Sequence, residues 1–85
     1  GAAMTMPRVT VHAVLHRDDM RDRAVRISLS GDDRGGVWIG RKWIHEMGQT
    51  GLHVMGRDTC GQRRRLPRVT FSIPFWLAKE TRLVR

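Results

Sequence analysis

Four histidines and one cysteine are the residues that could bind a metal ion: His12, His16, His45, His53 and Cys60. A zinc site needs three or four such ligands that converge on one point. His12 and His16 lie four residues apart in an alternating stretch, and a strand would place them on one solvent-facing side about 13 Å apart. His45 and Glu46 begin a metalloprotease-like motif, but Gln49 stands where the second histidine belongs. We therefore expect structural or surface histidines, with no metal and no other cofactor.

Nucleophilic catalysis requires a cysteine or serine beside a histidine that a third group orients. Cys60 lies in a stretch rich in glycine and arginine, and no catalytic signature surrounds it. The two carboxylate pairs, Asp18-Asp19 and Asp32-Asp33, fall in expected turns, where aspartate bonds to nearby backbone amides. The sequence therefore predicts a protein that is not an enzyme.

Charge is the strongest compositional signal. Sixteen Lys and Arg residues stand against eight Asp and Glu, for a formal net charge of +8, and only Lys42 and Lys79 are lysines. Arginine pairs with phosphate through two parallel hydrogen bonds, so a surface of this kind attracts nucleic acid or a nucleoprotein complex. The alternative is a merely solvated basic surface.

The segment 57–68 holds the densest local charge and has no hydrophobic period. We expect a basic surface loop or the tip of a hairpin there, with phosphate contacts that give affinity without sequence choice. Arg41 and Lys42 could extend the same surface. The arginines of this segment expected to contact nucleic acid or a partner are Arg57, Arg63, Arg64, Arg65 and Arg68.

Trp38 has two possible roles. If Val37 and Ile39 face the core, Trp38 lies on the exposed side of a strand beside Arg26, ready to stack on a base or a partner side chain. The favoured interpretation is that Trp38 packs under the C-terminal helix against Trp76, because so small a domain has few large apolar residues.

These residues must be positioned by short strands, which alternating apolar side chains predict at 8–16, 23–30, 37–39, 52–55 and 69–73. In the first strand, Val9, Val11, Ala13 and Leu15 would share one face, and Thr10, His12, Val14 and His16 the other. In the second, Val25, Ile27 and Leu29 would face inward. The second and third strands should form a central hairpin across the turn 31–36, which Gly and Asp favour.

The remaining segments predict turns and one helix. The polar stretch 17–22 should be a turn, and 41–47 one helical turn with Trp43, Ile44 and Met47 on a common face. Pro74 suits the first position of a C-terminal helix. Ile73, Trp76, Leu77 and Leu83 would face inward there.

The expected fold is mainly β with a short C-terminal helix, as a small bent antiparallel sheet or an SH3-like half-open barrel. Residues 4–85 should form a single domain. Gly1-Ala2-Ala3 has the character of an expression scar. The sequence has neither a membrane-spanning run nor a signal-peptide core, and one cysteine fits a reducing compartment, so we expect a cytoplasmic protein.

The order of motifs resembles a group of short proteins encoded by phages, prophages and other mobile elements. The matching segments are Val14-Leu15-His16, Ala24-Val25-Arg26-Ile27, Val37-Trp38-Ile39 and Ile73-Pro74-Phe75-Trp76-Leu77-Ala78-Lys79-Glu80. Gly40 departs from the group's proline, Thr81-Arg82 replaces the residues around its usual glycine, and segment 57–68 is longer. The resemblance implies a phage-type origin, a bacterial host and a shared fold, and it supplies no catalytic residue.

The sequence therefore predicts a non-enzymatic phage-type binding module that contacts nucleic acid or a nucleoprotein complex through its basic segment. The alternative is an inhibitor of a host defence complex, of the anti-CRISPR kind, that acts by protein–protein contact. A homodimer formed by pairing of sheet edges is a further possibility.

Overall fold

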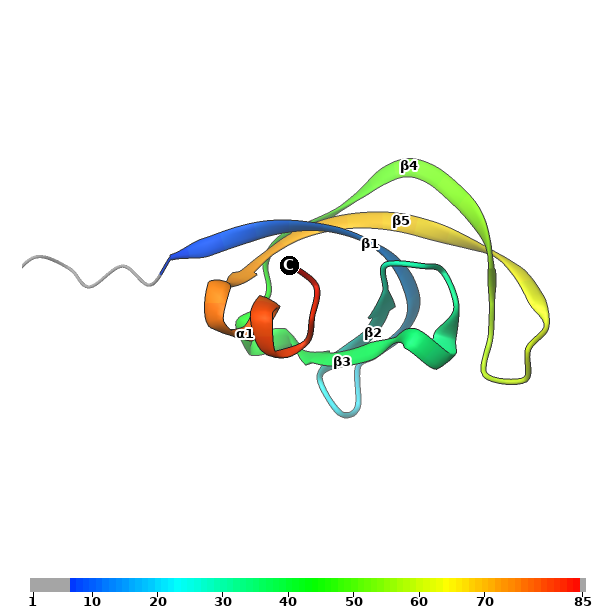
Figure 1. Ribbon diagram of the computed structural model, residues 1–85, viewed down its shortest axis with the longest axis horizontal. Helices are drawn as coiled ribbons and strands as arrows, with labels where there is room; N and C mark the ends of the chain where they lie inside the picture. The colour runs from blue at the N-terminus through cyan, green and yellow to red at the C-terminus, as the bar shows by residue number, and fades with distance from the viewer. Residues whose placement is uncertain (1–6, 85) are drawn as a thin grey trace, which may run out of the picture.

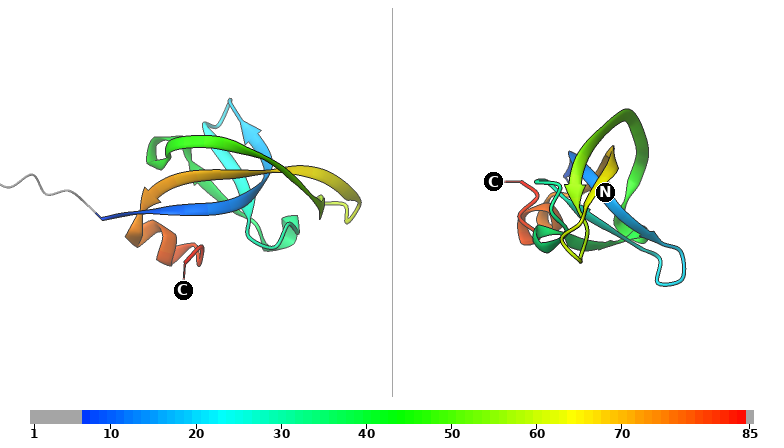
Figure 2. Two further views of the ribbon diagram at one scale, coloured as in Figure 1. Left: turned by 90° about the horizontal axis from the view of Figure 1, so that it is seen from above. Right: turned by 90° about the vertical axis from the view of Figure 1, so that its right-hand side faces the viewer.

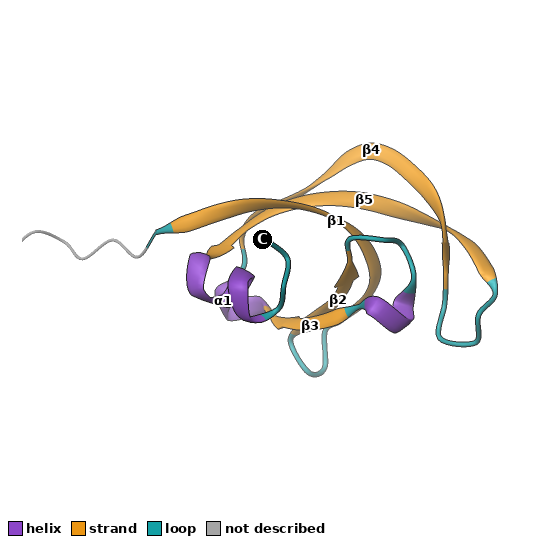
Figure 3. Cartoon of the chain, in the orientation of Figure 1, coloured by secondary structure: helices purple, strands orange, loops and turns teal. Residues whose placement is uncertain are grey.

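The computed structural model describes residues 7–84. Five antiparallel strands form one sheet in the order β3-β2-β1-β5-β4, and a short helix, α1 (Phe75–Glu80), follows the last strand (Figures 1 and 3). The strands are β1 (Arg8–Asp19), β2 (Ala24–Ser28), β3 (Val37–Gly40), β4 (His45–Arg57) and β5 (Arg63–Pro74). The expected mainly-β fold, a small bent antiparallel sheet with a C-terminal helix, is confirmed. The expression scar expected at residues 1–3 lies outside the described residues.

The centre of the sheet is the pair of long strands β1 and β5, which run side by side (Figure 2). The hairpin of β2 and β3 was expected to be central, and it pairs as predicted, but β3 forms one edge of the sheet. The other edge is β4, and β3 and β4 do not pair with each other, so the described sheet is open.

The main core lies on one face of the sheet, where α1 covers it. The predicted apolar faces of β2 and β5 are confirmed, since Val25, Ile27, Val69, Phe71 and Ile73 are all buried. Ser28, expected on the solvent-facing side of β2, is buried as well. Leu29, expected to face inward, is 48% exposed, because β2 ends at Ser28. The buried core comprises Val11, Ala13, Val25, Ile27, Ile39, Val69, Phe71, Ile73, Ala78 and Leu83.

The helix α1 begins one residue later than expected. Pro74 keeps an extended backbone as the N-cap, and the Phe75 amide donates a 2.9 Å hydrogen bond to the Pro7 carbonyl. Leu83 is buried as expected, but Trp76 is 43% exposed. The buried helix residue is Ala78, which belongs to the core cluster together with residues of β1 and β5.

A β-bulge in β1 changes which side chains face inward. The pairing of β1 with β2 shifts between Leu15 and Arg17, which leaves His16 as the extra residue. The side chain of His16 is only 3% exposed. The prediction that His16 shares a solvent-facing side with His12 is therefore wrong, and the expected turn at 17–22 is shorter because β1 continues to Asp19.

A second, smaller apolar cluster lies on the opposite face of the sheet. Val14, expected to face solvent, is buried there with Leu66. Gly31 and Gly56 meet at this point, and the Arg57 amide donates a 2.9 Å hydrogen bond to the Gly31 carbonyl. The hairpin of β4 and β5 is thereby fastened to the turn that follows β2.

The segment 41–57 holds more strand than the sequence predicts. A 3₁₀ turn spans Arg41–Trp43, and β4 then runs without interruption from His45 to Arg57, where only 52–55 was expected. The single helical turn expected at 41–47 is therefore wrong beyond Trp43, although Trp43, Ile44 and Met47 all pack against the core. The pairing of β4 with β5 has two register shifts, one between His45 and Gly48 and one between Gln49 and His53. Residues 48–51 are polar or glycine, so this part of the strand shows no alternation of apolar residues in the sequence.

The segment 57–68, expected to be a loop or the tip of a hairpin, forms the tip of the β4–β5 hairpin and is mostly strand. Arg57 ends β4, β5 begins at Arg63, and the connection is only residues 58–62. The Asp58 carboxylate orders this connection by accepting hydrogen bonds of 2.9 Å from the amides of Cys60 and Gln62. These bonds lower the pKa of Asp58, the Gln62 amide most strongly.

Candidate functional site

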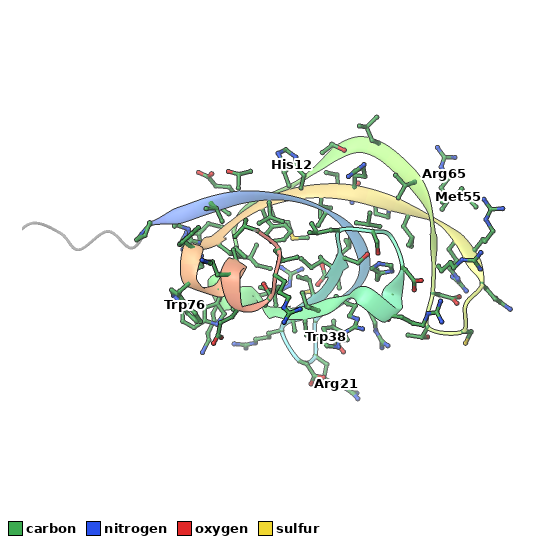
Figure 4. The ribbon with its side chains drawn as sticks, in the orientation of Figure 1. His12, Arg21, Trp38, Met55, Arg65 and Trp76 are labelled. Atoms are coloured by element: carbon green, nitrogen blue, oxygen red, sulfur yellow. The ribbon has the colours of Figure 1, made fainter. Side chains whose placement is uncertain are left out.

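The arginine run on β5 is divided between the two faces of the hairpin. Neighbouring residues of a strand point to opposite faces. Arg63 pairs with Arg57 and Arg65 with Met55, so these four residues share what we call the outer hairpin face. Arg64 pairs with Gly56 and lies on the opposite face with Leu66. Figure 4 shows Met55 and Arg65 projecting together from the end of the hairpin.

The arginines of this segment differ in how they are paired. Arg64 donates from Nε to the Asp58 carboxylate at 3.0 Å, and Arg57 donates to the Gly61 carbonyl at 2.9 Å. Arg63 and Arg65 are exposed and have no side-chain hydrogen bond or ion pair within residues 7–84. The outer hairpin face therefore carries two guanidinium groups available to a ligand. Arg68 is half-buried beside Val14.

Arg41 and Lys42 do not extend this surface. They lie in the 3₁₀ turn near α1, at the end of the molecule away from the hairpin tip (Figures 2 and 3). Arg41 forms an ion pair with Asp18, and this hydrogen-bonded carboxylate raises the pKa of Arg41. The Lys42 ammonium lies 5.1 Å from the centre of the Trp43 ring. Both basic groups are thus engaged locally.

Three strands place Arg17, Arg26 and Trp38 in one row. Arg17 of β1 pairs with Arg26 of β2, and Arg26 pairs with Trp38 of β3. Since Ile39 is buried on the other face, the row lies on the side of the sheet away from the main core. Trp38 is 48% exposed, and the Arg26 guanidinium carbon lies 5.8 Å from its ring centre. Of the two placements that the sequence allowed for Trp38, the structure has the one on the exposed face beside Arg26.

The favoured interpretation, that Trp38 packs under the C-terminal helix against Trp76, is wrong. Trp76 packs edge-on against Trp43, with ring centres 5.2 Å apart and planes at 88°. Figure 4 shows Trp38 and Trp76 at separate places on the molecule. The indole of Trp38 therefore remains available for contact.

A hollow of about 230 Å³ lies between this row and the tip of the β4–β5 hairpin. We call it the Trp38 hollow, and it is lined by Arg17, Arg26, Asp33, Trp38 and Thr59. A second hollow of about 420 Å³ shares Arg17, Asp33 and Thr59 with it and also reaches Arg64. Residues that are 42 positions apart in the chain, Arg17 and Thr59, meet only because the hairpin folds back over the sheet.

Arg17 is the residue of this site that sequence reasoning missed. It was assigned to a polar turn, but the bulge at His16 keeps it in β1 and directs it towards the Trp38 hollow. Arg17 is exposed and has no side-chain hydrogen bond or ion pair among residues 7–84. The placement of Arg17 depends on the β-bulge at His16, and no residue type in this stretch predicts a bulge.

A buried polar cluster lies beneath the Trp38 hollow. His16 Nε2 is 2.7 Å from Ser28 Oγ, and Nδ1 is 3.7 Å from the Asp33 carboxylate. Asp33 in turn accepts from Arg26 at 3.3 Å, and its carbonyl oxygen accepts from the same guanidinium at 2.8 Å. Burial lowers the pKa of His16, although the nearby Asp33 carboxylate opposes this effect.

The cluster has the composition of a serine–histidine–aspartate triad, which the sequence did not suggest. Ser28, however, is 1% exposed, and its hydroxyl accepts a 2.9 Å hydrogen bond from the Gly31 amide. The hydroxyl therefore faces protein groups rather than an open site. Through its two hydrogen bonds, Ser28 connects His16 at the bulge to Gly31 in the turn that contacts the β4–β5 hairpin.

Among residues 7–84, no group of three or more His, Cys, Asp or Glu side chains is arranged to hold a metal ion. Within the same residues, no helix has the length and apolar character needed to cross a membrane.

Comparison of the chain with protein-family models gives no match, and comparisons with curated proteins and with solved structures give no significant match. The candidate site therefore rests on the geometry above.

Proposed function

We propose that this chain is a non-enzymatic binding module for nucleic acid, with the β4–β5 hairpin as its main contact. The observation that carries this proposal is that Arg63 and Arg65 lie side by side on the outer hairpin face, and that neither guanidinium group has a side-chain partner among residues 7–84. Phosphate is the anion whose spacing and charge such arginines match.

The whole-molecule charge supports the same function. A formal net charge of +8 on 85 residues creates a positive field that attracts a polyanion before contact. Phosphate contacts of this kind release counterions from the nucleic acid, so the affinity depends on salt and little on sequence.

The test is binding of the protein to short single- and double-stranded DNA and RNA at roughly 50 mM and roughly 200 mM salt. We expect dissociation constants of roughly 1–100 µM near physiological salt, with clear weakening at the higher concentration. Absence of binding at the lower salt concentration, or binding that salt leaves unchanged, would overturn the proposal.

A second candidate function is inhibition of a host defence complex through protein–protein contact, as the resemblance to phage-encoded proteins implies. The observation that favours it is a group of exposed apolar side chains at α1, where Phe75 and Trp76 are both part-exposed. Aromatic residues of this kind are common at the centre of protein interfaces. A protein that binds no nucleic acid, but loses a host partner on Phe75→Ala with Trp76→Ala, would favour this function.

A further inference from the structure

We propose that the Trp38 hollow binds one unstacked base of a single-stranded nucleic acid, with an adjacent phosphate on Arg17. This inference rests on the proposed function and adds to it the class of nucleic acid and a second contact site. The hollow lies on the face of the sheet opposite the main core, and Arg63 and Arg65 do not line it.

The aromatic surface is present and fixed. Trp38 is half exposed in a paired strand, so its ring can be contacted without any rearrangement of the backbone. Arg26 supports the ring at 5.8 Å and is itself held by the carbonyl and carboxylate of Asp33. A base that stacks on such a ring loses little free energy to ordering of the protein.

Of the arginines that line the two hollows, Arg17 is the one available to bind a phosphate. The Asp33 carboxylate faces Arg26 at 3.3 Å, and the Asp58 carboxylate faces Arg64 at 3.0 Å. Arg17 lines both hollows and has no such partner within the described chain. As far as the structure describes the chain, the site therefore has one cation without a partner beside one exposed indole. An arginine can bind the phosphate of a nucleotide, and an indole can stack on its base.

The size and position of the hollow favour a single strand over a duplex. Its volume of about 230 Å³ is below the roughly 300–1,000 Å³ of pockets for drug-sized ligands, which suits one planar ring. The hollow is bounded on one side by Thr59 at the hairpin tip. A base in a duplex is stacked on its neighbours and could enter only by flipping, whereas a single strand presents its bases freely.

The experiment compares three oligonucleotides of equal length: single-stranded oligo-dT, an abasic strand with the same phosphates, and a duplex. Dissociation constants are measured for the wild-type protein and for Trp38→Ala, Trp38→Phe and Arg17→Gln. Arg21→Gln is the matched charge control, since Arg21 is exposed in the turn after β1 and lines neither hollow. Thermal unfolding of each variant confirms that it is folded.

We expect the wild-type protein to prefer oligo-dT to the abasic strand. Trp38→Ala should weaken oligo-dT binding about 5- to 150-fold and leave abasic binding unchanged, while Trp38→Phe retains most of the preference. Arg17→Gln should weaken both single strands more than Arg21→Gln does.

Four results would overturn the inference. Equal affinity for oligo-dT and the abasic strand, or an equal effect of Trp38→Ala on both, would show phosphate contacts alone, and the proposed function would stand. A stronger affinity for the duplex would show that the β4–β5 hairpin, and not the Trp38 hollow, makes the main contact with nucleic acid. Absence of binding to all three oligonucleotides would remove the proposed function and the inference together.

Discussion

Gly56 and Gly31 lie in backbone contact, and this contact holds the β4–β5 hairpin against the turn after β2. A side chain at Gly56 would overlap the Gly31 carbonyl oxygen, and its Cβ would lie 2.6 Å from Leu66 Cδ1. Next to this contact, the Arg57 amide donates to the same carbonyl at 2.9 Å. The absence of a side chain at Gly56 therefore lets the hairpin come into contact with the turn after β2.

The first prediction is that Gly56→Ala separates the hairpin from the turn. The overlap involves a backbone oxygen, which cannot move aside as a flexible side chain can, so we expect a loss of about 1–3 kcal/mol in the free energy of unfolding. Urea unfolding measures it. The control is Gly48→Ala in the same strand, where the added Cβ meets no atom within 4 Å. Equal effects of the two substitutions would show that the contact is unimportant.

The second prediction concerns pH. Burial lowers the pKa of His16 below its ordinary value of 6.5, so the folded protein binds fewer protons at this site than the unfolded chain does. The contribution of neutral His16 to stability is therefore complete above pH 6.5 and is lost as the pH falls below that value. Asp32 and Asp58 have lowered pKa values too, but their contributions are lost only as the pH falls below 3.8.

The measurement for His16 is the unfolding temperature of the wild-type protein and of His16→Gln between pH 5 and pH 8, a range set by the ordinary histidine pKa of about 6.5. The wild-type protein should lose stability towards pH 5, and His16→Gln should show a flatter profile from a lower starting point. His12→Gln is the control, because His12 is exposed in the same strand. A wild-type slope that survives in His16→Gln would assign the pH dependence to other groups.

The third prediction compares two tryptophans of similar exposure. Trp76 is 43% exposed and packs edge-on against Trp43, whereas Trp38 is 48% exposed and lies beside Arg26. Trp76→Ala should cost more stability than Trp38→Ala by about 0.5–1.5 kcal/mol, which is the ordinary value of an aromatic pair beyond its buried area. Thermal unfolding of the two variants decides it, and a larger loss for Trp38→Ala would contradict it.

The fourth prediction concerns the outer hairpin face. Each arginine that binds a phosphate contributes a slope of about 0.7–0.9 to the dependence of log affinity on log salt. Arg63→Gln with Arg65→Gln should therefore reduce the slope by roughly 1.4–1.8. The single substitution Arg21→Gln, of an exposed arginine outside this face, is the charge control. If the double substitution leaves the slope unchanged, these two arginines do not contact phosphate.

The sequence predicted the strands in which every second side chain is apolar and buried. It did not predict most of β4 or the first residues of β5, which have no such alternation. Val25 and Ile27, and Val69 to Ile73, show their period plainly, and the structure confirms them. The hairpin arm of β4 and β5 buries chiefly Leu66 and Gly56 at its outer end, so it has almost no hydrophobic period to detect. Its order comes from backbone pairing and from the Asp58 turn.

The candidate site was predictable only in part. The placement of Trp38 beside Arg26 was one of two that the sequence allowed, because strand alternation exposes Trp38 only if Val37 and Ile39 face the core. The structure decides between them by burying Ile39. The placement of Arg17 was not predicted, since its direction depends on the bulge at His16, which the pairing with β2 creates. The separation of Arg63 and Arg65 from Arg64 follows from strand alternation once the segment is known to be a strand.

The pairing of β1 with β5 has a consequence for the kinetics of folding. The pair joins Arg8 to Pro74, so the centre of the sheet forms only after a loop of more than half the chain has closed. Domains dominated by such distant contacts fold slowly, over about milliseconds to seconds. During synthesis, the apolar side chains of β1, β2 and β3 stay exposed until Phe71 and Ile73 have been made and can cover them. The arginines spread along the chain would reduce aggregation of such partly folded chains, because the chains repel one another.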